Sequence, residues 1–197
     1  MTFADATVFL IGGGASTSRI NLGKLRGRGI VVAINDSVRR IPWADIVFSA
    51  DGVWVTRRAD VLARFVGRKV AAIDGGYVPP KAAGPIEVLD RSRDVLVSDD
   101  PGLIYSAHNS GFAALNFAVS REAKRIVLIG FDLDGGNHWH GGYEWKCRFG
   151  RADHPKWAAA FNAIAPELER RGVDVVNLNP DSAIHCFRFA TLDEVLT

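Results

Sequence analysis

The chain has 197 residues, of which 48% are hydrophobic and 23% charged, and its formal net charge is +2. This length suits one compact domain that buries its core without disulfides, and the composition excludes disordered and fibrous classes of protein. The net charge is too small to indicate a nucleic-acid partner by itself.

The two cysteines, Cys147 and Cys186, lie far apart and form no CxxC pair. The sequence therefore supports neither a zinc ribbon nor a disulfide framework. The first residues include an acid but no basic segment, and their apolar run breaks after a few positions, so we expect no signal peptide or membrane span. We expect a cytoplasmic protein without a membrane partner, and the sequence leaves the oligomeric state open.

Six short apolar runs predict β-strands: "ATVFLIG", "GIVVAIND", "ADIVFSAD", "KVAAIDG", "KRIVLIGFD" and "VDVVNLN". Such runs, rich in Val, Ile and Leu and without alternation, are typical of parallel strands covered on both faces. Helical spacing of apolar residues predicts crossover helices over 110–123 and 155–172. The predicted fold class is therefore α/β: a Rossmann-like, doubly wound, mostly parallel sheet in a single domain spanning residues 1–197.

The segment from Tyr77 to Ala107 interrupts this pattern. It contains Pro79, Pro80, Pro85 and Pro101, and it mixes short strand-like pieces, "IEVLD" and "DVLVS", with turns. We predict an irregular central excursion that includes a short antiparallel pair of strands.

A glycine-rich turn follows the first predicted strand. In open α/β sheets, ligands bind beyond the carboxyl ends of the strands. At Gly12, Gly13 and Gly14 the missing side chains let backbone N–H groups approach a phosphate, and Ser16 or Thr17 can add a hydroxyl donor at the following helix start. The turn lacks the Gly-Lys-Ser/Thr of a P-loop and fits GxGxxG only partly. Many sheets enter a helix through such a turn, but three consecutive glycines exceed what a turn needs.

Polar residues also follow later strands. Asp51, in "SADG", could hold a cation or a ribose hydroxyl, or it could simply form an Asp-Gly turn. A second polar motif, "HNSG", precedes the helix predicted from residue 110 and consists of His108, Asn109, Ser110 and Gly111. An N-cap role explains Asn109 or Ser110, while His108 with Asn109 could donate to a ligand anion at the positive end of the helix dipole.

The stretch "FDLDGGNHWHGGYEW" is the most polar of the strand ends. Asp132 and Asp134 could bind Mg²⁺ or Mn²⁺ beside a diphosphate. His138 and His140 flank Trp139, so in an extended loop both imidazoles point the same way. Because no third ligand with a recognisable spacing follows, an acid–base or phosphate-contacting histidine is favoured over a zinc pair. Surface histidines in a glycine-rich loop are the alternative.

Taken in order, "LIGGGAS", "VVAIND", "WADIVFSADG", "HNSGFAALNFAVSREAKRIVLIGFD" and "HWHG" resemble the domain shared by 6-hydroxymethylpterin diphosphokinase-like proteins and motility-associated glycosylation factors. The chain is also distantly similar to the single-domain bacterial sialyltransferases, and most similar to small stand-alone members found in phage and prophage gene sets. The diphosphokinase branch has a two-acid "DLDG" where this chain has "SADG".

The resemblance implies roles for individual residues. It implies that the glycine turn with Ser16 holds nucleotide phosphates and that Asn35 contacts the donor nucleotide. It also implies that Asp51 matches an acidic position of the diphosphokinases. The residues implied to close the nucleotide pocket are Asn109, Ser110 and Gly111. For the catalytic histidine, His138, His140 and His154 compete.

We therefore predict a nucleotide-dependent transferase, a small glycosyltransferase-like enzyme that moves a sugar from a nucleotide donor to a hydroxyl acceptor. Catalysis is assigned to His138, His140 and Asp132, and any metal, Mg²⁺ or Mn²⁺, to Asp132 and Asp134. The alternatives are an ATP-dependent pterin-type diphosphokinase and a non-catalytic nucleotide-binding phage protein. The acceptor stays open between nucleic acid, a surface glycan and a small molecule.

Overall fold

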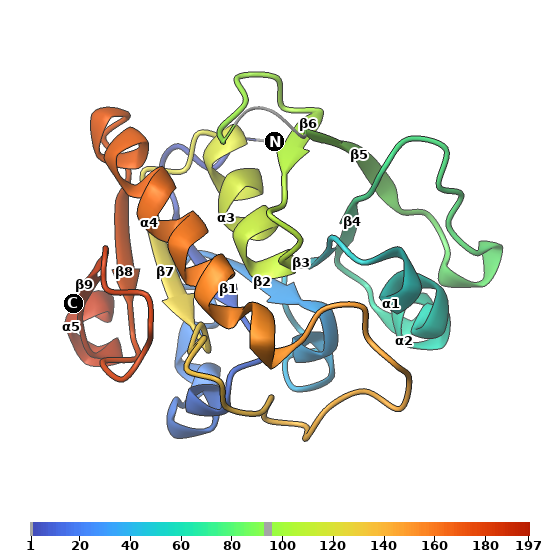
Figure 1. Cartoon of the computed structure of the whole chain (residues 1–197), viewed down its shortest axis with the longest axis horizontal. Helices are drawn as coiled ribbons and strands as arrows, with labels where there is room; N and C mark the ends of the chain where they lie inside the picture. The colour runs from blue at the N-terminus through green and yellow to red at the C-terminus, as the bar shows by residue number, and fades with distance from the viewer. Residues whose placement is uncertain (1, 93–95) are drawn as a thin grey trace.

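A single parallel sheet organises the molecule. The computed structural model describes residues 2–92 and 96–197 (Figure 1). Within these residues nine strands lie in the order β6-β5-β4-β3-β2-β1-β7-β8-β9, and every neighbouring pair is parallel. The strands are β1 (Thr7–Ile11), β2 (Ile30–Ile34), β3 (Ile46–Ser49), β4 (Arg68–Ala72), β5 (Glu87–Ser92), β6 (Leu103–Tyr105), β7 (Arg125–Ile129), β8 (Asp174–Asn177) and β9 (Arg188–Phe189).

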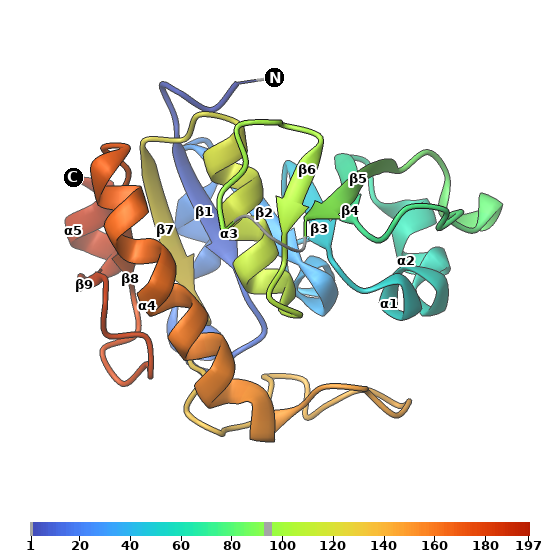
Figure 2. The same ribbon diagram turned by 45° about the horizontal axis from the view of Figure 1, so that its top comes forward.

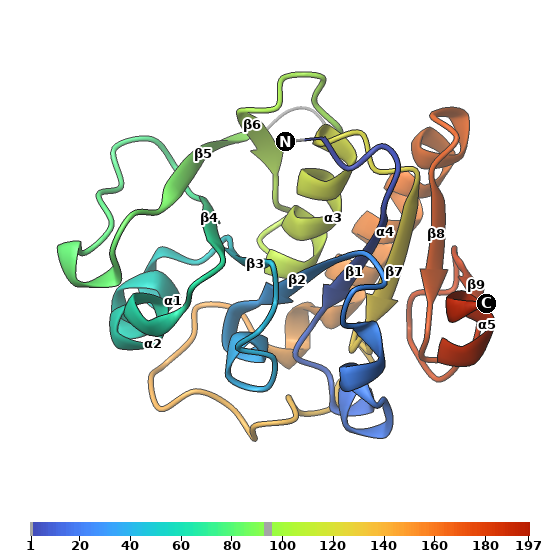
Figure 3. The same cartoon turned by 180° about the vertical axis from the view of Figure 1, so that it is seen from behind.

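Helices cover both faces of the sheet, which is the reason its strands are apolar on both sides. Alternate residues of β1 enter different cores: Val8 and Leu10 pack on the α3–α4 side, whereas Phe9 and Ile11 pack on the side of α1, α2 and α5. Figure 1 shows α3 and α4 in front of the sheet, and Figure 3 shows the opposite face. The helices are α1 (Gly52–Arg57), α2 (Ala59–Arg64), α3 (Ser110–Ser120), α4 (His154–Arg170) and α5 (Leu192–Leu196). In the part of the chain that the structure describes, no helix is both long and apolar enough to cross a bilayer.

The α/β fold class, the six predicted strands and the two crossover helices are confirmed. The antiparallel pair expected in the central excursion is wrong, because β5 and β6 pair in parallel and extend the sheet. Of "DVLVS", residues 94 and 95 lie outside the described residues and 96–98 form no strand. Two parallel strands begin at the same edge of the sheet, so the chain must run back to that edge before β6 begins. The connection from β5 to β6 is long enough for this, whereas the turn of a tight hairpin is not.

The chain between β1 and β2 contains no α-helix. It forms two 3₁₀ turns, Ala15–Arg19 and Leu22–Leu25, where a helix start was expected after the glycine turn. Ser16 is held by the carboxylate of Asp132 beyond β7, so the chain is fixed to the neighbouring strand within the first residues of this segment. The glycine turn is therefore not followed by a long helix whose aligned peptide dipoles would attract a phosphate.

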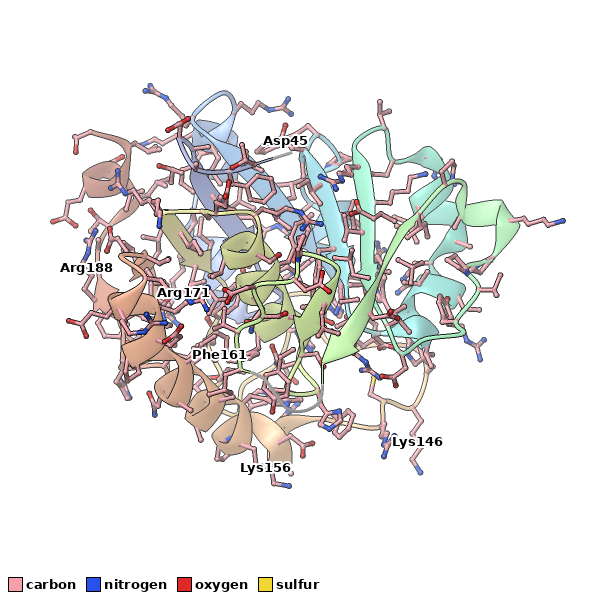
Figure 4. All side chains as sticks on the ribbon, turned by 90° about the horizontal axis from the view of Figure 1, so that it is seen from above. Asp45, Lys146, Lys156, Phe161, Arg171 and Arg188 are labelled. Atoms are coloured by element: carbon pink, nitrogen blue, oxygen red, sulfur yellow. The ribbon has the colours of Figure 1, made fainter. Side chains whose placement is uncertain are left out.

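The loop after β7, residues 132–153, is called the strap below. Figure 2 shows it running beneath the carboxyl ends of the strands before it joins α4. In Figure 4, Lys146 of the strap lies at the opposite end of the molecule from Asp45, which precedes β3 at the amino edge of the sheet. The strap thus covers the edge at which parallel sheets bind ligands.

Candidate functional site

A cleft of about 1280 Å³ lies between the strap and the carboxyl ends of the strands. Such a volume exceeds that of most small-molecule pockets, which hold roughly 300–1,000 Å³. The predicted site residues that line it are Gly12, Gly13, Gly14, Asn35, Asp51, His108, Asn109, Ser110, Gly111, Asp132, Asp134, His138 and His140. Ser16 is the predicted site residue that does not line the cleft.

The glycine turn is packed tightly against its own protein. A Cβ atom would lie 2.6 Å from the carbonyl oxygen of Gly130 at Gly12, 2.6 Å from His138 Nδ1 at Gly13, and 2.5 Å from Asp132 Oδ2 at Gly14. Two of the amides are also used, because Gly12 donates to the carbonyl of Ile129 (2.7 Å) and Gly14 to that of Gly130 (2.9 Å). Close packing therefore explains all three glycines, and the crevice between β1 and β7 is filled by the chain itself.

Asp132 connects three strand ends. Its Oδ2 accepts the backbone N–H of Ser16 (2.9 Å), its Oδ1 accepts the Ser16 hydroxyl, and Oδ1 also accepts Asn179 Nδ2 (2.9 Å) beyond β8. The residue is buried. Ser16, predicted to hold a phosphate, thus gives both of its donors to Asp132. In the structure these two residues fix the turn, and their functional roles stay predictions.

The two aspartates predicted as a metal pair differ in their surroundings. Asp134 is exposed and its Oδ1 accepts the N–H of Gly136 (2.8 Å), while both oxygens of buried Asp132 already accept hydrogen bonds. Among the described residues, no group of three or more His, Cys, Asp or Glu side chains has metal-binding geometry. Since a hard cation needs free oxygen ligands, this donor set does not fit one, and no step below is derived through a metal.

The start of α3 faces the cleft. Asn109 is the N-cap, and its Oδ1 accepts the N–H of Phe112 (2.9 Å). The Ser110 hydroxyl accepts the N–H of Ala50 (3.1 Å), which ties the helix to the end of β3. A Cβ at Gly111 would lie 2.8 Å from the Phe131 ring. The N–H groups of Ser110 and Gly111 have no partner within the helix, because the first turn of a helix leaves its amides free.

Asp51 and Asn35 lie at the ends of β3 and β2. Asp51 is the N-cap of α1, and its Oδ1 accepts the N–H groups of Val53 (2.8 Å) and Trp54 (3.2 Å). Asn35 has a φ of 51°, and its buried Oδ1 has no hydrogen-bond partner. Burial, together with the nearby carboxylates, raises the pKa of Tyr143, and a hydrogen bond from Asn35 partly offsets this rise. The cleft therefore contains a buried amide oxygen without a hydrogen-bond partner and a tyrosine whose pKa is raised.

Left-handed backbone conformations gather in this cleft. Outside glycine, the described residues with positive φ are Asn35, Ala107 (45°), His108 (58°), Leu133 (49°) and Glu122 (70°). All of them except Glu122 line the cleft. Such conformations cost free energy in non-glycine residues and concentrate at functional sites, so the backbone marks the cleft independently of its side chains.

The strap is anchored at its first turn to the glycine turn of β1. The carbonyl of Gly13 accepts the N–H of Trp139 (2.9 Å), and His138 Nδ1 lies 3.3 Å from the same oxygen. Because a carbonyl oxygen only accepts, this contact requires the Nδ1–H tautomer and leaves the lone pair of His138 Nε2 available.

A second anchor fixes the middle of the strap over β2. Arg58 binds Asp36 (3.0 Å) and Glu144 (3.0 Å), and its guanidinium lies 4.8 Å from the ring centroid of Trp145. Farther along, Phe149 stacks on His108 with ring centroids 4.8 Å apart. The strap thus crosses the carboxyl ends of β1 and β2 and reaches the start of α3.

Neither Asp36 nor Arg58 is among the site residues predicted from the sequence. Asp36 is 2% exposed and also accepts Trp54 Nε1 (2.9 Å). Burial alone would raise the pKa of Asp36, but the hydrogen bonds from Arg58 and Trp54 and the charge of Arg58 outweigh it and lower that pKa. Arg58 lies in the basic tripeptide "TRR", and its partner Glu144 is 86 residues away, so a local pattern could not reveal the pair.

The surroundings of His138 lower its pKa and so favour the neutral imidazole. Desolvation by surrounding protein atoms and the interactions with His140 and His154 lower its pKa, while the hydrogen bond to Gly13 and the charge of Asp36 offset only part of this shift. The residue as a whole is exposed. The His140 ring stacks on His138 with centroids 5.0 Å apart and an interplanar angle of 4°. At neutral pH the His138 imidazole can therefore accept a proton.

The acidic side chains that line the cleft have partners within the protein, whereas several of the basic ones do not. Each lining carboxylate already accepts hydrogen bonds from the protein, as seen for Asp36, Asp51, Asp74, Asp132 and Asp134. Among the described residues, Arg57, Lys146 and Arg148 line the cleft without an acidic partner. Arg151 binds the amide oxygen of Asn137. Arg57, Lys146 and Arg148 are exposed, and no carboxylate of the described residues neutralises them, so the cleft carries a positive charge that favours an anionic ligand.

These features define an α/β protein with an all-parallel, Rossmann-like sheet and a strap-covered cleft at its carboxyl edge. The chain matches no family model, and comparison with curated proteins and with solved structures finds no significant match.

Proposed function

We propose that the chain is a nucleotide-dependent transferase, which moves a sugar from a nucleotide donor to a hydroxyl acceptor in the strap-covered cleft. One observation carries this proposal: the carboxylates of the cleft already accept hydrogen bonds from the protein, while Arg57, Arg148 and the first amides of α3 lack anionic partners. A phosphate-bearing ligand supplies the missing negative charge.

The donor phosphates are assigned to the start of α3. The free N–H groups of Ser110 and Gly111 point along the positive end of an 11-residue helix, where phosphates bind well. Arg148 is next to Phe149, whose ring stacks on His108 at the same helix start. Arg57 faces the cleft from α1. This assignment moves the phosphate site away from the glycine turn, whose space is taken by Gly130, His138 and Asp132.

His138 is the general base in this proposal. Its Nε2 takes the proton of the acceptor hydroxyl while the hydroxyl oxygen attacks the anomeric carbon of the donor sugar. The bond from that carbon to the phosphate oxygen breaks, and its electron pair leaves with the nucleotide. The amides of Ser110 and Gly111 and the Arg148 guanidinium stabilise the charge that develops on the phosphate. Gly13 keeps the base in the correct tautomer.

Thermal unfolding across nucleoside mono-, di- and triphosphates and nucleotide sugars, each with and without Mg²⁺ or Mn²⁺, tests the proposal. A ligand at a hundredfold excess over its Kd adds about 2.7 kcal/mol of stability, which is roughly 5–10 °C in Tm for a domain of this size. A shift with a nucleoside diphosphate, CMP or its sugar supports the proposal and names the donor. No shift with any nucleotide contradicts it.

Two further measurements separate the alternatives. Stabilisation by ATP or AMP that depends on Mg²⁺ would favour the diphosphokinase. Ligand binding with no release of free nucleotide from the nucleotide sugar would favour a binding module. Arg148→Gln should lose most of the nucleotide shift, whereas Lys81→Gln, an exposed cation on the 3₁₀ turn Lys81–Ala83 outside the cleft, should keep it.

A further inference from the structure

The outer rim of the cleft is basic. From Lys146 to Lys156 the chain carries four cations, with Arg148 and Arg151 between them. The acid within this stretch, Asp153, accepts the N–H of Gly150 (2.9 Å) and lies 3.8 Å from Lys156. Glu144, just before it, binds Arg58. The carboxylates near the rim therefore leave most of its positive charge uncompensated.

The two rim lysines lie at and beyond the margin of the cleft, because Lys146 is among the residues that line it and Lys156 is not. Lys146 and Lys156 are exposed and extend outward from the same side of the molecule in Figure 4. A ligand confined to the cleft would not reach both amino groups. A polyanion that continues from the cleft onto the surface would meet them in turn, because its charges are spaced along a chain.

From this arrangement we infer that the acceptor is a single-stranded nucleic acid whose phosphates lie along the Lys146–Lys156 rim, an inference that rests on the proposed transferase function. The strand brings a nucleotide that carries a free hydroxyl under the strap, and His138 takes the proton of that hydroxyl. We expect a single strand because the strap covers the cleft. The reacting group must pass beneath residues 132–153, and a nucleotide inside a duplex cannot do so without leaving the base stack. Half-buried Phe149 and Trp157 border the same rim, where aromatic rings bind unstacked bases.

Fluorescence anisotropy with a labelled oligothymidylate tests the inference. The rim variant is Lys146→Glu/Lys156→Glu. The control is Arg28→Glu/Lys81→Glu, which reverses two exposed cations outside the cleft and changes the net charge equally, by −4, from +2 to −2. A glutamate at position 156 lies in the first turn of α4, where a negative charge stabilises a helix, so the rim variant should fold.

We expect the wild-type chain to bind the strand in low salt and the rim variant to bind it at least about tenfold more weakly, with a salt dependence flatter by about 1.4 in logarithmic slope for two lost phosphate contacts. The control should stay within about twofold of the wild type. Absence of binding, or equal weakening in both variants, overturns the inference. A duplex or a sulfated polysaccharide bound as tightly as the strand overturns it too.

The outcome is separable from that of the proposed function. The rim variant should keep the thermal shift given by the donor nucleotide, because neither lysine is assigned to the donor phosphates. A nucleotide shift without strand binding refutes the acceptor and leaves the transferase standing. Strand binding without any nucleotide shift refutes the transferase, and with it the acceptor role of the strand.

Discussion

Two regions at the carboxyl edge of the sheet differ in how far the protein satisfies its own polar groups. In the crevice between β1 and β7, the glycine turn, Ser16 and Asp132 bond to one another, and no room is left for a side chain. In the cleft over β2, β3 and the start of α3, an amide oxygen and helix amides lack hydrogen-bond partners, cations lack acidic partners, and the backbone is strained. The first region has the composition of a ligand site, but the second has the unmet interactions of one.

A glycine-rich turn therefore has two possible physical causes. Glycines admit a phosphate, but they also admit another segment of the same chain, and here the second cause accounts for all three. A buried polar atom without a hydrogen-bond partner, such as Asn35 Oδ1, is the better indicator of a ligand, because it costs free energy until something binds.

The largest loss of stability is expected from a substitution in the crevice between β1 and β7. Gly130 and Gly141 both have positive φ, 75° and 81°, but a Cβ at Gly130 would clash with the Thr17 hydroxyl whereas one at Gly141 meets nothing within 4 Å. Gly130→Ala should lose about 4 kcal/mol of unfolding free energy, from overpacking plus backbone strain. Gly141→Ala, the matched control, should lose about 1 kcal/mol. Urea denaturation measures both, and equal losses would mean that β1 and β7 are not packed as described.

Next in size is the buried carboxylate beneath the strap. Asp36→Asn leaves the Arg58 guanidinium without its main counter-charge and should lose about 3 kcal/mol of stability at pH 7. Because the folded-state pKa of Asp36 is lowered, its contribution is present above the ordinary carboxyl value of 3.8 and is lost as the pH falls through the folded-state pKa. Urea midpoints measured from pH 7 to pH 3 should therefore converge for the two proteins; a constant difference would contradict the pairing.

The proposed base follows. His138→Gln should lower kcat by roughly 100-fold, since general bases typically contribute 10²–10⁴-fold, with little change in nucleotide affinity. The acid limb of kcat/KM for the wild type should lie below the ordinary histidine pKa of 6.5. Initial rates between pH 5 and pH 9 provide the measurement. Unchanged turnover in His138→Gln would remove the assigned role.

A smaller effect concerns the stacked neighbour. His140→Phe keeps a flat ring against His138 but removes a repelling charge, so the pKa of His138 should rise toward its ordinary value. The acid limb of the pH–activity profile should therefore move to higher pH. It should stay below the position expected for a fully solvated histidine, because burial still lowers the pKa of His138. An NMR titration of the imidazole protons follows the same shift without turnover. A shift to lower pH would contradict the electrostatic account.

The smallest change in stability is expected at the second strap anchor. Glu144 is 70% exposed, so Glu144→Gln should alter unfolding free energy by less than about 1 kcal/mol. Hydrogen exchange of residues 143–147 should nevertheless accelerate, because the ion pair to Arg58 holds this segment. Asp60→Asn, which removes an exposed ion pair on α2, serves as the control and should leave strap exchange unchanged.

The fold was readable because its signals are local. Apolar runs such as "VFLI" and the helical spacing over 110–123 reflect burial on both faces of one sheet. The parallel pairing of β5 with β6 was missed, because short strands carry no mark of direction. Convergence of the strand-end residues on one cleft also followed from topology. The topology does not predict which of these residues already bond to the protein itself. Asp132 contacts Ser16 across 116 residues, and Arg58 contacts Glu144 across 86.

A structure of the chain with a bound nucleoside diphosphate would show whether the start of α3, and not the glycine turn, holds the phosphates. We expect the phosphates within hydrogen-bonding distance of the Ser110 and Gly111 amides and of Arg148, with the glycine turn still packed against Gly130. Phosphates on the amides of the glycine turn, with the contacts of Gly130 and Asp132 displaced, would contradict this expectation.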